Sequence, residues 1–260
     1  MRSRWAPPPL RDRVRPGAVL RLLARTLSEA CLTVGTLIVL FVAYVLLWTG
    51  VKADRAMDGE RARLRDDWAA AAPGAPAPGA PASGPSATAP PPAAPAAPQE
   101  PPPLPAGRPF AEMYVPRFGP DWVKPVLEGT DAELLKKGLG HYAGTARPGA
   151  VGNFSVAGHR RTYGDPFKDF PRLRAGDEVI VQDAAARYTY TVRGGPLRTL
   201  PTDVAVVDPV PPKSPFTVPG RYLTLTTCDP EWGHSHRLVV WAELTGTRPV
   251  PQGGRGRSSG

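Results

Sequence analysis

The hydrophobic pattern divides the chain into one long apolar run near the N-terminus and short alternating segments in the C-terminal half. From Ala30 to Trp48 the sequence is apolar apart from two Thr and one Gly. About 20 apolar residues in a helix, rising roughly 1.5 Å each, span a bilayer core of about 30 Å. We therefore expect a transmembrane signal-anchor helix over residues 28–50.

The charges on either side of this run predict its orientation. Residues 1–27 carry seven Arg against one Asp, whereas residues 51–68 carry five basic and five acidic residues. Because excess positive charge marks the cytoplasmic side, we expect a single-pass protein of the cell membrane with a basic cytoplasmic tail over residues 1–27 and an extracellular C-terminal bulk. A cleavable signal peptide is the alternative, but the apolar run exceeds the roughly 7–15 residues of a signal-peptide core.

Composition separates a linker from a folded domain. Residues 51–68 are charged and contain no Pro, so they could extend the helix as a short stalk, whereas residues 69–107 contain 14 Pro. The latter stretch cannot bury a core and is typical of a disordered spacer, which would reach on the order of 100 Å if fully extended. We expect a stalk and Pro/Ala-rich linker over 51–107, a folded domain over 108–246, and a disordered tail over 247–260.

Short alternating segments bounded by Gly and Pro turns predict an all-β domain. One short helix is expected at Asp131–Lys137, with Thr130 or Asp131 as its cap. Eight short strands in one domain favour a closed or nearly closed β-barrel. The predicted strands are Glu112–Val115, Asp121–Val126, Gly152–Ala157, Glu178–Gln182, Arg187–Arg193, Val204–Val207, Tyr222–Cys228 and Arg237–Leu244.

The net charge of +9 does not indicate a nucleic-acid partner. The stretch from Arg108 to Thr245 carries 17 basic and 15 acidic residues, so the predicted domain is nearly neutral. Nucleic-acid binding depends on cationic charge carried by the binding surface. The positive charge lies instead in the two tails, where it indicates membrane topology.

The predicted membrane topology keeps the two cysteines apart. Cys31 lies inside the apolar run, where a small packing residue is the simplest interpretation, and Cys228 lies in the exported domain. They cannot form an intrachain disulfide, so Cys228 is an unpaired thiol outside the cytoplasm. Such a thiol is a candidate nucleophile.

Strand alternation brings two further residues toward this thiol. In Tyr222–Cys228, Cys228 lies on the face opposite the apolar Leu residues, and Arg237 likewise leaves the apolar face of the next strand. Eight residues join the two strands, which suits an antiparallel hairpin with Cys228 and Arg237 as neighbours. His159 follows the alternating segment Gly152–Ala157 on its more polar side. We expect these strand ends to converge at one rim of the barrel.

These three residue types suit acyl transfer through a thioester. A thiolate is a good nucleophile toward a carbonyl, and a cationic neighbourhood favours its formation. Arg is permanently charged and can hydrogen-bond a developing oxyanion. His can protonate a leaving amine and later accept a proton from an incoming one. We therefore predict Cys228 as nucleophile, His159 as acid/base and Arg237 as oxyanion partner.

The segments around these residues resemble the sortase family. Thr224-Leu-Thr-Thr-Cys228 with Arg237 nine residues later is similar to the TLxTC…R signature, and the sequence HRRTYGDPF from His159 onward is similar to the segment that carries the sortase histidine. The resemblance covers about residues 110–245. The HRRTYGDPF form and the Ala/Pro-rich tether resemble the class E sortases of high-GC Gram-positive bacteria.

The resemblance implies an eight-stranded sortase barrel with one or two short helices. It implies a transpeptidase that cleaves an LAxTG- or LPxTG-like C-terminal sorting signal between Thr and Gly and transfers the protein to an amino group of a peptidoglycan precursor. Its partners would be secreted proteins bearing that signal. Thr227, Thr226 and Tyr163 are the expected substrate-binding residues, and no cofactor or metal is expected.

Other functions stay open at this point. His234, His236, Cys228 and Asp229 offer ligands for a zinc site, although no C-x₂-C or His-x₃-His spacing accompanies them. A pilin-polymerising sortase, a hydrolytic cysteine protease and a non-enzymatic membrane-tethered wall-binding domain are the remaining alternatives. The wall-binding alternative leaves the unpaired Cys228 unexplained.

Overall fold

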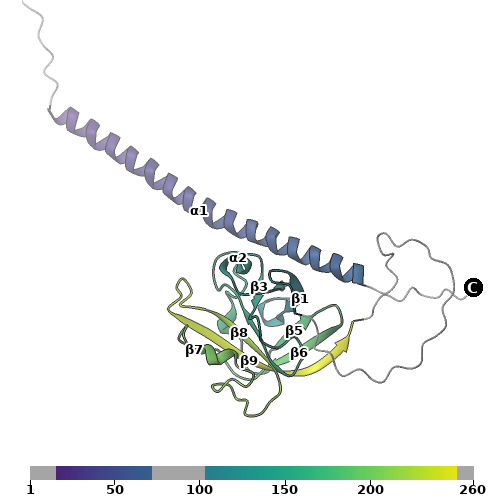
Figure 1. The fold of residues 1–260 in the computed structure, drawn as a ribbon. Helices are drawn as coiled ribbons and strands as arrows, with labels where there is room; N and C mark the ends of the chain where they lie inside the picture. Colours follow the sequence, from purple (N-terminus) through teal and green to yellow (C-terminus); the bar gives the residue numbers. More distant parts are fainter. Residues whose placement is uncertain (1–15, 72–102, 251–260) are drawn as a thin grey trace, which may run out of the picture. The chain divides into compact units, whose positions relative to one another are not determined.

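The N-terminal part of the structure is one long helix. The computed structural model describes residues 16–71 and 103–250 (Figure 1). Helix α1 (Pro16–Ala71) has 56 residues, and its segment Leu20–Tyr44, with a mean hydropathy of 1.9, is long and apolar enough to cross a membrane. That segment begins N-terminal to the predicted span at 28–50. The predicted helical extension through residues 51–68 is confirmed.

Several sequence predictions fall on residues outside the description. The first 15 residues of the predicted cytoplasmic tail, linker residues 72–102 and tail residues 251–260 lie outside the described ranges. The chain divides into two units, Met1–Trp48 and Thr49–Gly260. The second unit contains all the strands and all the candidate site residues, and the remaining description concerns this unit.

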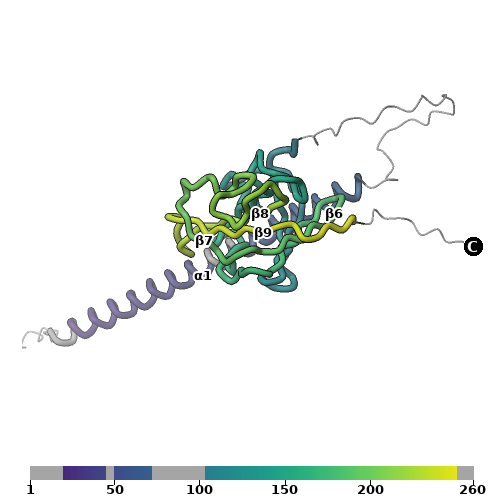
Figure 2. Tube along the Cα trace, turned by 90° about the horizontal axis from the view of Figure 1, so that it is seen from below, coloured from purple at the N-terminus to yellow at the C-terminus, as the bar shows by residue number. Residues whose placement is uncertain are grey.

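The second unit is built on a closed β-barrel (Figures 1 and 2). Its sheet has the strand order β6-β5-β1-β2-β3-β4-β8-β9-β7, and an additional pairing of β6 with β9 closes eight strands into a barrel. Strand β7 is a ninth strand on β9. The strands are β1 (Pro109–Tyr114), β2 (Val123–Glu128), β3 (Leu139–His141), β4 (Gly152–Ala157), β5 (Glu178–Gln182), β6 (Ala186–Val192), β7 (Leu197–Thr199), β8 (Arg221–Asp229) and β9 (His236–Pro249).

The predicted closed all-β barrel is confirmed, with differences in single elements. Val204–Val207, predicted as a strand, forms the 3-10 helix η3 (Val204–Val207). Pro201 and Pro209 flank this Val run, and Pro cannot donate to a strand ladder, so the run does not pair. Strand β9 continues to Pro249, beyond the predicted domain end at 246, because its C-terminal part pairs with β6.

Strands β3 and β7 were missed because each has only three residues. Strand β3 also contains a glycine, which weakens a strand pattern. This glycine is required by packing, since a Cβ at Gly140 would lie 2.4 Å from the carbonyl oxygen of Gly129. The predicted short helix is confirmed as α2 (Ala132–Leu135), with Asp131 at its N-cap position. The remaining short helices are η1 (Pro116–Phe118) and η2 (Phe170–Arg172).

The hairpin of β8 and β9 is covered on both faces. Leu223 and Leu225 of β8 are buried in the barrel core, together with the alternating apolar residues of β9. The other face carries Trp241, which packs against Val206 of η3 and donates a 3.1 Å hydrogen bond from Nε1 to the Val206 carbonyl. Thr224 of β8 is also buried under this segment. The strands that present the candidate nucleophile are therefore held rigidly from both sides.

Candidate active site

The β8–β9 hairpin places Cys228 opposite Arg237. These two residues are direct partners in the antiparallel ladder, and Asp229 opposite His236 is the last pair before the turn. The predicted pairing across the hairpin is confirmed. It arises because both strands keep strict alternation up to the turn, so the residue that ends one apolar pattern meets the residue that begins the next.

His159 reaches the same end of the barrel through parallel pairing of β4 with β8. Ala157 is paired with Thr226, so a further step of two residues on each strand brings His159 level with Cys228. The Gly158 N–H donates to the Thr226 carbonyl at 3.1 Å, which prolongs the ladder beyond β4. His159 thus lies two residues past the end of the strand rather than at its last position.

His159 and Cys228 line one cavity of about 280 Å³. Cys228 is half-buried, and both cysteines of the chain are free. The other lining residues come from the segment after β4 and from the β8–β9 turn: Arg160, Arg161, Thr162, Glu231, Trp232, Gly233 and His234. The structure therefore brings the predicted nucleophile and the predicted acid/base to one cavity.

The surroundings of His159 favour its neutral form. Burial lowers the pKa of His159 below its ordinary value, and the nearby Lys136 cation lowers it further. Its Nε2 atom is buried and has no hydrogen-bond partner in the structure. The ring of Tyr163 packs against the imidazole with 5.2 Å between ring centroids. The hydrogen-bonding capacity of this nitrogen is therefore not used by any protein group in the structure.

The Arg237 guanidinium is held by the turn that joins the two strands. Its Nη1 donates to the carbonyl oxygens of His234 and His236, each at 3.0 Å. Arg237 is beside Cys228 in the ladder but is not among the residues that line the cavity. The turn carbonyls fix one edge of the planar guanidinium, and five N–H groups leave it further donors for a ligand.

An ion pair that sequence reasoning missed joins the two sides of the cavity. Nη1 of Arg160 lies 2.5 Å from Oδ1 of Asp229, with side chains only 12% and 16% exposed. Arg198 of β7 donates from Nε to the other Asp229 oxygen at 2.7 Å. Burial raises the pKa of Asp229, but the hydrogen bonds from Arg198 and Arg160 outweigh burial and hold that pKa below its ordinary value.

This ion pair connects the neighbours of the two predicted catalytic residues. Arg160 directly follows His159, and Asp229 directly follows Cys228. The pair therefore restrains the distance between the two backbones that carry the imidazole and the thiol. The sequence carries one signal for this pair: a basic residue directly follows His159, and an acidic residue directly follows Cys228.

The turn residues that had no role in the sequence analysis form a second brace. Glu231 forms an ion pair with Arg161, and the Arg161 guanidinium lies over the Trp232 ring at 5.1 Å from its centroid. Arg161 also pairs with Asp165 of its own loop at 3.2 Å. The β8–β9 turn is thus attached to the segment after His159 across the mouth of the cavity.

The three predicted substrate-binding residues surround the site without lining the cavity. Thr227 is buried and donates its hydroxyl to the Gly158 carbonyl at 2.8 Å. Thr226 is buried, and its hydroxyl lies 2.9 Å from that of Tyr142. Tyr163 packs on His159. Thr227 and Tyr163 therefore contact His159 or the backbone that precedes it.

Two of the other histidines, His236 and His141, are engaged by neighbours. His236 Nδ1 lies 3.1 Å from Nη2 of Arg198. His141 is buried, with its Nδ1 2.5 Å from Glu128, and is not part of the cavity. Within residues 16–71 and 103–250, no group of three or more His, Cys, Asp or Glu side chains is placed to hold a metal ion.

Comparisons with known proteins agree with this geometry. The Sortase domain model matches residues 113–245. Sortase SrtE1 of Streptomyces coelicolor is 36% identical over 248 residues, which cover 92% of this chain and 62% of SrtE1. SrtE2 of the same organism is 32% identical over 246 residues, which cover 92% of this chain and 89% of SrtE2. The chain thus spans less than two thirds of SrtE1 but most of SrtE2.

Solved structures give the same result. The structure of sortase E from Streptomyces avermitilis is 62% identical with a TM-score of 0.54, and the match covers 59% of this chain and 98% of that one. The structure of sortase E1 from Streptomyces coelicolor, which has a tripeptide in its active site, is 38% identical with a TM-score of 0.53, covering 58% and 96%. The chain therefore belongs to the sortase family and matches its class E members.

Proposed function

We propose that this protein is a membrane-anchored transpeptidase in which Cys228 is the nucleophile, His159 the general acid and base, and Arg237 the oxyanion donor. The observation that carries the proposal is the cavity lined by both His159 and Cys228. Arg237 is the direct ladder partner of Cys228. The ion pair of Arg160 with Asp229 keeps the two sides of the cavity together.

Acylation follows from these positions. The neutral His159 takes the proton of the Cys228 thiol, the resulting thiolate attacks the carbonyl carbon of the scissile peptide bond, and Arg237 hydrogen-bonds the oxygen as it becomes negative. The carbon–nitrogen bond then breaks, and the imidazolium of His159 gives its proton to the leaving amine. The products are a thioester between Cys228 and the N-terminal fragment and a released C-terminal fragment with a free amino group.

Deacylation reverses the proton transfer. The now neutral His159 accepts a proton from an incoming amine as the amine attacks the thioester carbonyl. The carbon–sulfur bond breaks, and Cys228 leaves as a thiolate while a new amide bond forms. The lowered pKa of His159 suits this step, since it keeps the imidazole neutral and able to accept a proton.

The proposed substrates are secreted proteins with a C-terminal LAxTG- or LPxTG-like signal, cleaved between Thr and Gly. The proposed acceptor is an amino group of a peptidoglycan precursor. Both follow from the likeness to class E sortases. The Arg-rich N-terminus and the apolar segment Leu20–Tyr44 support a cytoplasmic N-terminus with the barrel outside the membrane.

The test uses the full chain in lipid nanodiscs with LAxTG or LPxTG peptides and an added amine, analysed by mass spectrometry. We expect the N-terminal peptide fragment to become joined to the amine, with a thioester adduct on Cys228. Cys228→Ala should abolish the transfer, and Cys31→Ala is the matched control that should retain it.

Three outcomes would contradict the proposal. Transfer that survives Cys228→Ala would exclude the thioester mechanism. Cleavage that added amine neither accelerates nor diverts would identify a hydrolytic protease rather than a transpeptidase. A wild-type chain that neither cleaves the peptides nor reacts at Cys228 with a thiol-reactive probe would favour the wall-binding alternative.

A further inference from the structure

The part of α1 beyond the apolar segment has a buried face. Ala53, Met57, Glu60 and Leu64 are buried, whereas most residues between them are exposed. Their spacing of four, three and four residues places them on one side of a helix. The surrounding Arg and Asp residues conceal this stripe in the sequence, where the stretch is expected to form only a charged stalk. We call residues 53–67 the docking segment.

The docking segment supplies the cationic partners of a carboxylate that is buried in the barrel wall. Glu112 of β1 is 2% exposed, and its carboxylate lies 3.0 Å from Nε of Arg61 and 3.4 Å from Nη2 of Arg65. Burial of the Tyr114 hydroxyl and its hydrogen bond to Glu112 raise the pKa of Tyr114 to about 12. A buried carboxylate is costly without cationic partners, and here the helix provides them.

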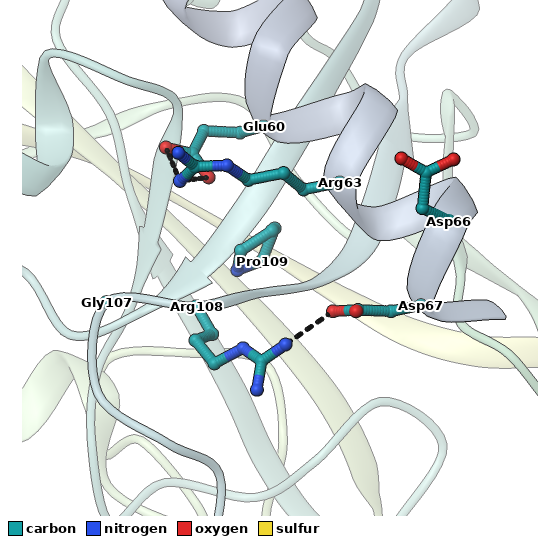
Figure 3. Close-up of a pocket in the computed structure, with 7 residues that line it drawn as sticks. All are labelled: Glu60, Arg63, Asp66, Asp67, Gly107, Arg108 and Pro109. Carbon is teal, nitrogen blue, oxygen red and sulfur yellow. Dashed lines mark hydrogen bonds and ion pairs between the residues drawn. The ribbon is translucent and has the colours of Figure 1, made fainter. Parts of the chain in front are cut away.

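A second polar attachment lies at the C-terminal end of the docking segment (Figure 3). Nη2 of Arg108, just before β1, lies 2.8 Å from Oδ2 of Asp67, while Arg63 pairs with Glu60 on the helix itself. A hollow of about 280 Å³ separates the helix from the start of β1 here. This end is held by polar groups and is less tightly packed than the buried stripe.

At its N-terminal end the docking segment contacts the loop that follows His159. A Cβ placed on Gly164 would lie 2.4 Å from Cε of Met57 and 2.9 Å from Oδ1 of Asp54. Met57 is 3% exposed, so its side chain fills the space against the Gly164 backbone. Asp54 also lies 4.0 Å from Nζ of Lys124 on β2.

The loop contacted by Met57 has an unfavourable backbone. Thr162, Tyr163 and Asp165 have φ values of 74°, 51° and 47°, and Gly164 between them has 79°. Each non-glycine residue in this region costs of order 1 kcal/mol or more and persists only when its surroundings hold it. Tyr163, directly before Gly164, is the residue whose ring packs on His159.

We propose that the docking segment is an integral part of the catalytic domain, with Met57 and Gly164 as positioning residues that hold Tyr163 against His159. The proposal rests on the proposed role of His159. The chain of contacts runs from Met57 to Gly164, along the backbone to Tyr163, and from its ring to the imidazole. Solved class E relatives match 58–59% of this chain.

The test compares full-length variants in nanodiscs by amide hydrogen exchange and by acylation kinetics. Met57→Ala removes the side chain over Gly164, so we expect exchange in residues 160–168 to accelerate about tenfold or more. We expect kcat for acylation to fall about tenfold and KM to change by a smaller factor, since the imidazole of His159 is the reacting group that Tyr163 supports. Met57→Leu should restore both, and Arg55→Ala, on the exposed side of the helix, should change neither.

A double-mutant cycle tests the contact itself. Gly164→Ala should lower kcat because the new methyl group meets Met57 and because alanine is strained at a φ of 79°, and Met57→Ala removes only the first of these effects. The loss in the double variant should therefore be smaller than the product of the two single losses. If Met57→Ala prevents folding, Met57→Val, a smaller truncation, replaces it in both measurements.

Unchanged exchange in residues 160–168 of a folded Met57→Ala protein would overturn the proposal, as would losses that multiply in the double variant. Exchange does not depend on the reaction. If the wild-type chain transferred no peptide, the proposed function would fail, and the exchange measurement would still decide whether the docking segment holds the loop.

Discussion

The ion pair between Arg160 and Asp229 should contribute substantially to the free energy of unfolding. Asp229→Asn keeps the size of the side chain but removes the charge that faces Arg160 and Arg198. Removing one partner of a buried ion pair costs about 3–5 kcal/mol, because the remaining charge is left uncompensated. Exposed pairs contribute about 0–1 kcal/mol. The Arg160 and Asp229 side chains are 12% and 16% exposed, which places this pair near the buried class.

We therefore expect Asp229→Asn to lower the free energy of unfolding by about 2–3 kcal/mol, since the Asn oxygen can still accept one hydrogen bond. The measurement is urea unfolding of the full chain in detergent micelles, followed by Trp fluorescence. Arg198→Gln is the matched control. It removes only the partner that is 54% exposed and should cost less than about 1 kcal/mol.

The reasoning is refuted if Asp229→Asn costs no more than Arg198→Gln. Arg160→Gln should resemble Asp229→Asn, and the double variant should be less destabilised than the sum of the two, because both remove the same interaction. Simple additivity would show that the two charges act independently.

The pH dependence of this effect has a definite sign. The pKa of Asp229 is lower in the folded protein than its ordinary value, so the stabilisation is present above the ordinary pKa of about 3.9. It is lost as pH falls through the folded value. The difference between wild type and Asp229→Asn should thus be constant from about pH 5 to pH 8 and shrink in stronger acid.

Three further predictions concern single side chains. Lys136→Gln removes a cation that lowers the pKa of His159, so the His159 limb of the pH–rate profile should move to higher pH, more at low salt than at high salt; a downward shift would contradict this. Arg237→Lys keeps the charge but loses the planar fork, so kcat should fall about 10²–10³-fold in the peptide assay; near wild-type turnover would exclude Arg237 as the oxyanion donor. Glu128→Gln weakens the buried pair with His141 and should cost about 1–3 kcal/mol in thermal unfolding, with an unchanged melting temperature as the contrary result.

Local features of the site could be predicted from the sequence because they depend on short-range alternation. The pairing of Cys228 with Arg237 follows from two strands in which apolar and polar residues alternate strictly up to the short turn that joins them. The position of His159 near a strand end follows equally from the segment that precedes it. Each of these inferences uses residues that are close together in the chain.

The remaining features depend on pairings between distant segments. The parallel ladder between β4 and β8, which brings His159 level with Cys228, joins residues 69 positions apart, as in the hydrogen bond from Thr227 to Gly158. Alternation predicts a strand but not its neighbour, so the opposite charges that follow His159 and Cys228 could not by themselves identify the pair of Arg160 with Asp229. The residues of the buried stripe that includes Met57 recur at helical spacing in the sequence. Only the structure shows that the barrel covers this side of the helix.

The docking segment also changes what the Pro- and Ala-rich stretch does. The stretch was expected to be a spacer that sets the reach of the domain, yet the chain on both sides of residues 72–102 belongs to one packed unit. The entropic cost of connecting two ends held in one unit grows only as the logarithm of the length of the connection, about 0.6 kcal/mol for each doubling. Insertions or deletions in this stretch should therefore change the free energy of unfolding very little. The length of the stretch can vary while its two ends keep their positions.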